Sequence, residues 1–237
     1  MSRSRMGAVS LATAGVLFVL YPAIRPWHDE STVSGATASM SSPAWVAAHL
    51  FAVLGFILVP LGLLAVADAL GRTRSASLAL IAAVVTWIGA GLTLPYYGAE
   101  DFGLHAIASK HAGNLLELVK AVRYQPLAIT IFGAGLLMLG IGALLAAVAI
   151  WRSGILPRYS GVVFAAGLAL FLPQFYLPSA ARIVHGVLTG IGLAILAVSL
   201  WRAKATAVED IPAVRGPAPD PDLAQGLPGS GIKRVSG

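Results

Sequence analysis

Six long apolar runs constrain the fold of this chain more than any other feature. They cover about residues 7–24, 44–67, 78–97, 127–151, 160–177 and 183–201. Each run is close to the roughly 20 residues that a helix needs to cross a bilayer core about 30 Å thick. We therefore predict an all-α, polytopic membrane helix bundle with six transmembrane helices. Pro173 lies inside the fifth run, where we expect a kink.

The composition agrees with lipid, not water, as the main solvent of the chain. Charged residues make up only 11% of the sequence and hydrophobic residues 57%, with a mean hydropathy of +0.82. The arginines and lysines stand singly or in pairs at the ends of the runs, so the net charge of +6 does not indicate nucleic-acid binding. The absence of cysteine from the sequence excludes disulfides and thiolate chemistry.

The positive residues between the runs predict the orientation in the membrane. With the N-terminus inside, the inner connections carry the larger set: Arg3, Arg5, Arg72, Arg74, Arg152, Arg158, Arg202 and Lys204. The outer connections then carry Arg25, Lys110, Lys120, Arg123 and Arg182. We predict a plasma-membrane protein with both termini cytoplasmic. Residues 1–204 form the bundle, and the Pro- and Gly-rich residues 205–237 form a disordered cytoplasmic tail.

A polar insert separates the third and fourth runs and is the first candidate for a site. It extends from Pro95 to Pro126. Helical spacing places a set of mostly apolar residues on one face: Leu104, Ile107, His111, Leu115, Leu118 and Val122. We expect an amphipathic extracytoplasmic helix here that lies on the membrane surface or caps the bundle.

Catalytic candidates lie at the start of this insert. Asp101 precedes His105 by four residues, so on a regular helix the carboxylate would orient the imidazole as a general base. Glu100 and Asp101 with His105 also form a candidate set of ligands for a divalent cation. Tyr96, Tyr176 and Arg182 fall on the same predicted side and are candidates for substrate binding. The alternative is a solvated interfacial helix with no catalytic role.

Two histidines lie within predicted spans, near their outer ends. Ionisable groups in a membrane normally face the bundle interior or a wet cavity. His49 and His185 are therefore candidate ligands of a metal or haem held between two helices. The alternative is that both are hydrogen-bonded or interfacial. Along the last run, Thr189 and Ser199 continue a polar stripe that fits either an aqueous path or close helix packing.

Three functions remain open from the sequence. The first is a small membrane enzyme or a metal- or haem-binding protein with an extracytoplasmic pocket of histidine, acidic and tyrosine side chains. The second is a transporter of a small solute or ion. The third is a non-enzymatic membrane component that binds a protein partner or lipid through its outer cap. The first requires the candidate residues to converge, and the third does not.

Overall fold

The computed structural model describes residues 2–110 and 113–203, and these residues form helices without any strand. Five helical stretches in this part of the chain are long and apolar enough to cross a membrane. They are α1 (Arg3–Ile24), α3 (Pro43–Ala69), α4 (Ala76–Gly98) with its extension to Ser109, α7 (Pro126–Ser153) and α9 (Ser179–Arg202). This architecture confirms the all-helical fold and fits a multi-pass membrane protein. The predicted tail, 205–237, lies outside the described residues.

The predicted fifth span is a broken helix. α8 covers Arg158–Ala169, and a short 3-10 turn, η2, follows at Pro173–Tyr176. Proline has no N–H to donate to the carbonyl four residues earlier, which here is that of Ala169, the last residue of α8. The α-helix ends where this hydrogen bond is lost. With 12 residues, α8 is shorter than the roughly 20 needed to span a bilayer, so the structure does not confirm six spans.

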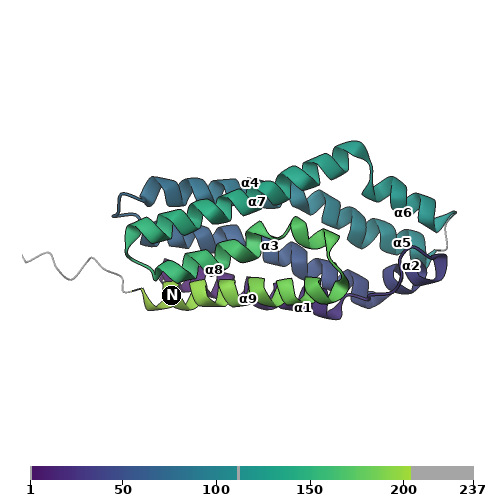
Figure 1. Ribbon diagram of the computed structural model, residues 1–237, viewed down its shortest axis with the longest axis horizontal. Helices are drawn as coiled ribbons and strands as arrows, with labels where there is room; N and C mark the ends of the chain where they lie inside the picture. The colour runs from purple at the N-terminus through teal and green to yellow at the C-terminus, as the bar shows by residue number, and fades with distance from the viewer. Residues whose placement is uncertain (1, 111–112, 204–237) are drawn as a thin grey trace, which may run out of the picture. The chain divides into compact units, whose positions relative to one another are not determined.

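The long helices run antiparallel to their neighbours in the bundle (Figure 1). α1 packs against α3 and α9, α4 packs against α3 and α7, and α8 lies between α7 and α9. The start of α1 and the end of α9 meet at one end, where the Arg5 guanidinium lies 5.3 Å from the centre of the Trp201 ring. At the opposite end, α2, α5 and α6 extend beyond the long helices.

Glycines allow several of these helices to approach closely. A Cβ built on Gly89 of α4 would lie 2.8 Å from the carbonyl oxygen of Gly135 and 2.8 Å from the amide nitrogen of Leu139, both on α7. Backbone atoms cannot move aside as a flexible side chain can. The glycine is therefore a packing requirement at this position.

We expect Gly89→Ala to lower the stability of the bundle by about 1–3 kcal/mol, because the added methyl group overlaps the α7 backbone. Gly91→Ala is the matched control, since a Cβ there meets nothing within 4 Å. The control should be neutral or slightly stabilising, because alanine favours helix over glycine. Thermal unfolding of both variants in detergent measures the difference. Equal melting temperatures would contradict the packing argument.

A group of short elements forms a cap at the end of the bundle opposite the N-terminus. The cap consists of α2 (Val33–Met40), the π-helical turn η1 (Ala99–Gly103), α5 (Leu104–Ser109) and α6 (Leu115–Arg123). It has its own small apolar core, separate from the core of the long helices: Ala36, Met40, Trp45, Leu104, Ala108, Leu115 and Val119.

The cap differs from the sequence prediction in two ways. The connection after the first run, for which no helix was predicted, contains α2, which Thr32 caps through a hydrogen bond from the Gly35 amide. The predicted single amphipathic helix is two helices, α5 and α6. Gly113 lies between them with φ +59°, a left-handed conformation that interrupts a helix and that glycine adopts without strain. His111 lies outside the described residues.

Candidate functional site

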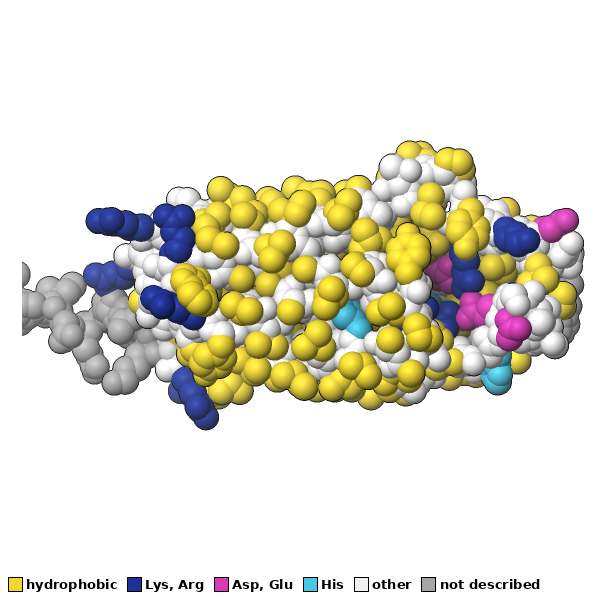
Figure 2. Space-filling model, in the orientation of Figure 1, with side chains coloured by type: hydrophobic (Ala, Val, Ile, Leu, Met, Phe, Trp, Pro, Cys, Tyr) yellow, Lys and Arg dark blue, Asp and Glu magenta, His cyan; other side chains and the backbone are white. Residues whose placement is uncertain are grey.

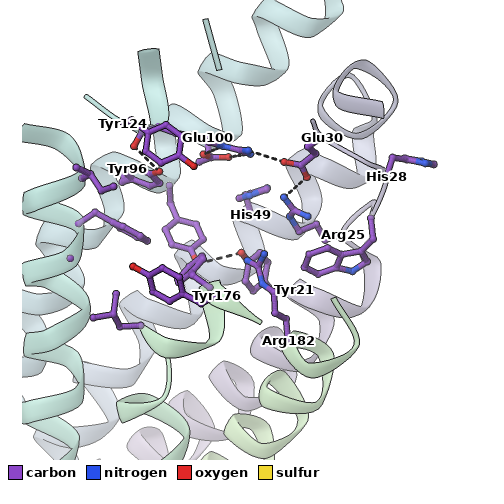
Figure 3. Close-up of a pocket in the computed structure, with 18 residues that line it drawn as sticks. Tyr21, Arg25, His28, Glu30, His49, Tyr96, Glu100, Tyr124, Tyr176 and Arg182 are labelled. Atoms are coloured by element: carbon purple, nitrogen blue, oxygen red, sulfur yellow. Dashed lines mark hydrogen bonds and ion pairs between the residues drawn. The ribbon is translucent and has the colours of Figure 1, made fainter. Parts of the chain in front are cut away.

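A cavity of about 620 Å³ lies where the long helices meet the cap (Figure 3). Its wall is mostly aromatic: Tyr21, Trp27, Tyr96, Tyr97, Tyr124, Phe132, Phe175 and Tyr176. Its charged residues are Arg25, Glu30, Glu100, Arg123 and Arg182, and it also includes His28, His49, Ile129, Gly133 and Leu172. This volume and this mixture of apolar walls with a few polar groups are typical of small-molecule sites.

The cavity opens on the flank of the bundle. Three of its lining side chains are well exposed and therefore mark its rim: Tyr176 at 86%, Tyr124 at 66% and Ile129 at 40%. The cap extends past the cavity at the end of the bundle. Figure 2 shows acidic and basic side chains in a recess on this flank, bordered by hydrophobic side chains. The polar interior is thus reached from the side, between apolar surfaces.

A chain of four charges ties the cap to the bundle at the cavity. Arg25, just after α1, pairs with Glu30 at 2.6 Å, and Glu30 pairs with Arg123 at 2.9 Å. Arg123 also holds Glu100 in two hydrogen bonds of 2.6 and 2.9 Å. Burial lowers the pKa of Arg123, but its bonds to Glu100 and Glu30 raise the pKa by more, so the net shift is above the usual range. Two guanidinium groups and two carboxylates alternate along this chain, so their formal charges cancel.

Trp45 contacts both ends of this chain of charges, and the sequence analysis did not select it as a site residue. Its side chain is fully buried, and its indole N–H donates to the carbonyl oxygen of Glu100 at 2.8 Å. That carbonyl belongs to the π-helical turn η1, and such turns frequently occur at functional sites. The guanidinium of Arg25 lies 4.6 Å from the indole ring centre. No local sequence pattern signals these contacts, because they join segments 55 residues apart.

His49 lines the cavity from α3. Its Nδ1 lies 2.8 Å from the carbonyl oxygen of Trp45. A carbonyl can only accept, so Nδ1 carries a proton and donates it to this carbonyl. The ring is 3% exposed and packs against Tyr21 and Tyr97. Tyr97 donates to the hydroxyl of Tyr21 at 3.5 Å, which leaves the Tyr21 proton available to a ligand.

The structure brings five of the predicted site residues together and leaves three outside. Tyr96, Glu100, His49, Arg182 and Tyr176 all line the cavity. Asp101, His105 and His185 do not. The roles predicted for these eight residues stay predictions. Sequence reasoning did not select Arg25, Glu30 or Arg123 as site residues.

Asp101 and His105 do not form the hydrogen bond that would orient the imidazole as predicted. Both carboxylate oxygens of Asp101 are buried without a hydrogen-bond partner in the described part of the chain. His105 uses Nδ1 to bond the carbonyl oxygen of Met40 at 2.8 Å instead. The physical reason is the π-helical turn Ala99–Gly103. A π-helix is wider than an α-helix, so side chains four residues apart no longer lie above one another on the same face. Within residues 2–110 and 113–203, no cluster of three or more metal-ligating side chains was found.

The two candidate haem or metal ligands lie in different places. His49 lines the large cavity, whereas His185 lines a separate space of about 10 Å³, which holds no more than about one water. His185 Nε2 donates to the carbonyl oxygen of Gly167 at 2.8 Å. Thr189 and Ser199 bond carbonyl oxygens of their own helix, which favours packing over an aqueous path for this stripe.

The fold and the site together define a helical protein with several membrane-compatible helices and a lateral cavity. Comparison with protein-family models, with curated proteins and with solved structures gave no match.

Proposed function

We propose that this chain is a plasma-membrane protein that crosses the bilayer six times, with both termini in the cytoplasm. α8 and η2 would together make the fifth crossing, because α9 begins again at the capped end of the bundle. Arg3, Arg5, Arg158 and Arg202 gather at the opposite end, as the positive-inside rule requires of a cytoplasmic face. The cap would then be extracytoplasmic.

The absence of native cysteine allows a direct test of this orientation. Single cysteines replace Ser31, near the cap, and Thr73, in the connection between α3 and α4. In intact cells, a membrane-impermeant maleimide should label Ser31→Cys and should label Thr73→Cys only after permeabilisation. The reverse pattern would place the cap in the cytoplasm and would contradict the proposal.

We further propose that the cavity binds a small amphiphilic molecule that enters sideways from the outer leaflet. The observation that carries this proposal is the position of the opening on the flank, with exposed apolar or aromatic side chains at its rim. In a bilayer, a flank opening faces lipid and not bulk water. Aromatic walls would hold the apolar part of the molecule, and the polar interior would hold its head.

An alkyl-diazirine phospholipid tests this function. After illumination of the protein in nanodiscs, adducts should concentrate on residues 129–133 and 172–176, which line the cavity from α7 and from the region of η2. Exposed apolar residues of α4, such as Leu80 and Trp87, supply the background labelling of an ordinary lipid-facing surface. An excess of unlabelled lipid should compete with the cavity adducts and leave the background unchanged. Labelling that is uniform over the bundle would overturn the proposal.

A further inference from the structure

The three guanidinium groups of the cavity differ in their partners. Arg25 pairs with Glu30, and Arg123 pairs with both Glu30 and Glu100. Arg182 forms no ion pair with any carboxylate in the described part of the chain. Since the carboxylates of Glu30 and Glu100 balance the other two arginines, one positive charge in the cavity is left without a counter-charge.

Arg182 is held in place even though it lacks an acidic partner. Its Nε donates to the Gln174 side-chain oxygen at 3.1 Å, and Gln174 is only 3% exposed. The guanidinium carbon lies 4.9 Å from the Trp27 ring centre and 5.0 Å from that of Phe175. These contacts fix the guanidinium through its faces and through Nε. They leave its two terminal NH₂ groups without an acceptor among residues 2–110 and 113–203.

A second donor lies beside Arg182. Tyr21 and Arg182 both line this cavity and also the small space of about 10 Å³, and Figure 3 draws them near one another. The Tyr21 hydroxyl receives the hydrogen bond of Tyr97, so its own proton is free to be donated. A fixed guanidinium with a neighbouring hydroxyl donor matches the oxygens of a phosphate or carboxylate, because a planar guanidinium binds such anions through two parallel hydrogen bonds.

We infer that the amphiphile bound in the cavity carries an anionic head, a phosphate ester or a carboxylate, which binds the terminal nitrogens of Arg182 and the hydroxyl of Tyr21. This inference rests on the proposed function and adds the charge of the ligand to it. The bound anion supplies the counter-charge that the protein does not. The apolar part of the ligand extends past Phe132 and Leu172 towards the rim at Ile129.

The test compares head groups on identical short chains. Binding of dioctanoyl phosphatidylglycerol and of dioctanoylglycerol, which has the same chains but no phosphate, to the full-length protein in detergent is measured by native mass spectrometry. We expect the anionic lipid to bind the wild type about tenfold more tightly, which corresponds to about 1.4 kcal/mol. Arg182→Gln should remove this preference and leave dioctanoylglycerol binding unchanged, and Arg182→Lys should retain part of it.

Arg158→Gln is the matched control. Arg158 also packs against an aromatic ring, that of Trp151 at 5.0 Å, but it does not line the cavity. This variant removes the same charge and should keep the tenfold preference. Equal binding of the two lipids by the wild type, or an unchanged preference in Arg182→Gln, would overturn the inference. If Arg182→Gln does not fold, the inference is tested by the affinities of the wild type for the two lipids and by the lipid preference of Arg182→Lys.

Competition by inorganic phosphate distinguishes a failure of this inference from a failure of the proposed function. Phosphate carries the head-group charge but no apolar chain, so it should compete at least a hundredfold more weakly than phosphatidylglycerol. Competition equal to that of the lipid would support the anion site at Arg182 and reject the amphiphile. Binding of both lipids without a preference would retain the proposed function and reject the anionic head. Binding of neither lipid would reject the proposed function itself.

Discussion

Arg123→Gln is expected to destabilise the protein by about 3 kcal/mol and to lower its melting temperature by several degrees. The substitution removes both hydrogen bonds to the Glu100 carboxylate, whose side chain is only 10% exposed. A buried charge that loses its partner typically costs roughly 3–5 kcal/mol. We expect the lower end of this free-energy range, because the Arg123 side chain is 20% exposed and Glu30 keeps Arg25 as a partner. A thermal scan of the purified protein in detergent measures the change.

Two variants make this prediction specific. Arg3→Gln removes an arginine whose ion pair with Asp68 is long, at 3.6 Å, and open to solvent, with side-chain exposures of 84% and 49%. Its cost should stay below about 1 kcal/mol. The double variant Glu100→Gln with Arg123→Gln leaves no unpaired carboxylate at position 100, so it should recover part of the stability that Arg123→Gln loses. A double variant less stable than Arg123→Gln would show that charge pairing is not what holds the cap.

Gly133→Trp is expected to weaken binding of dioctanoyl phosphatidylglycerol at least tenfold without unfolding the protein. Gly133 lines the cavity, and a Cβ built on it meets nothing within 4 Å. The backbone therefore accepts a side chain here, and an indole in the cavity would occupy space that the ligand needs. Native mass spectrometry measures the affinity, and a thermal scan checks that the fold is retained.

Gly91→Trp is the control for this substitution. A Cβ on Gly91 also meets nothing within 4 Å, but the residue does not line the cavity. Gly91→Trp should therefore leave lipid affinity unchanged. If both tryptophan variants bound the lipid like the wild type, the ligand would lie elsewhere on the bundle.

The long helices could be predicted closely because their cause is local. The apolar runs at 44–67, 127–151 and 183–201 became α3, α7 and α9 with ends shifted by only a few residues. In lipid, an apolar segment satisfies its backbone hydrogen bonds only within itself, so length and hydropathy nearly determine the helix. The run at 160–177 was the exception, because the effect of Pro173 on the helix outweighed the apolar composition.

The composition of the site depended on contacts between distant segments. The sequence indicated polar residues near one end of the bundle, and Tyr96, Glu100 and Arg182 do line the cavity there. It also favoured Asp101 with His105, which form no hydrogen bond where a π-helical turn replaces the regular helix. Spacing along one helix describes neighbours only while that helix remains regular.

The sequence alone therefore determined that the long helices are apolar enough to cross a membrane, the helical class of the fold and the end of the bundle that gathers polar groups. These properties follow from the apolar runs and from the high cost of placing charges in hydrocarbon. Only the tertiary structure decided which charges neutralise one another. Arg25 and Arg123 are paired with carboxylates brought from other segments, while Arg182 is left facing the cavity. Pairing depends on distances of a few ångströms between segments far apart in the chain, and no local pattern encodes those distances.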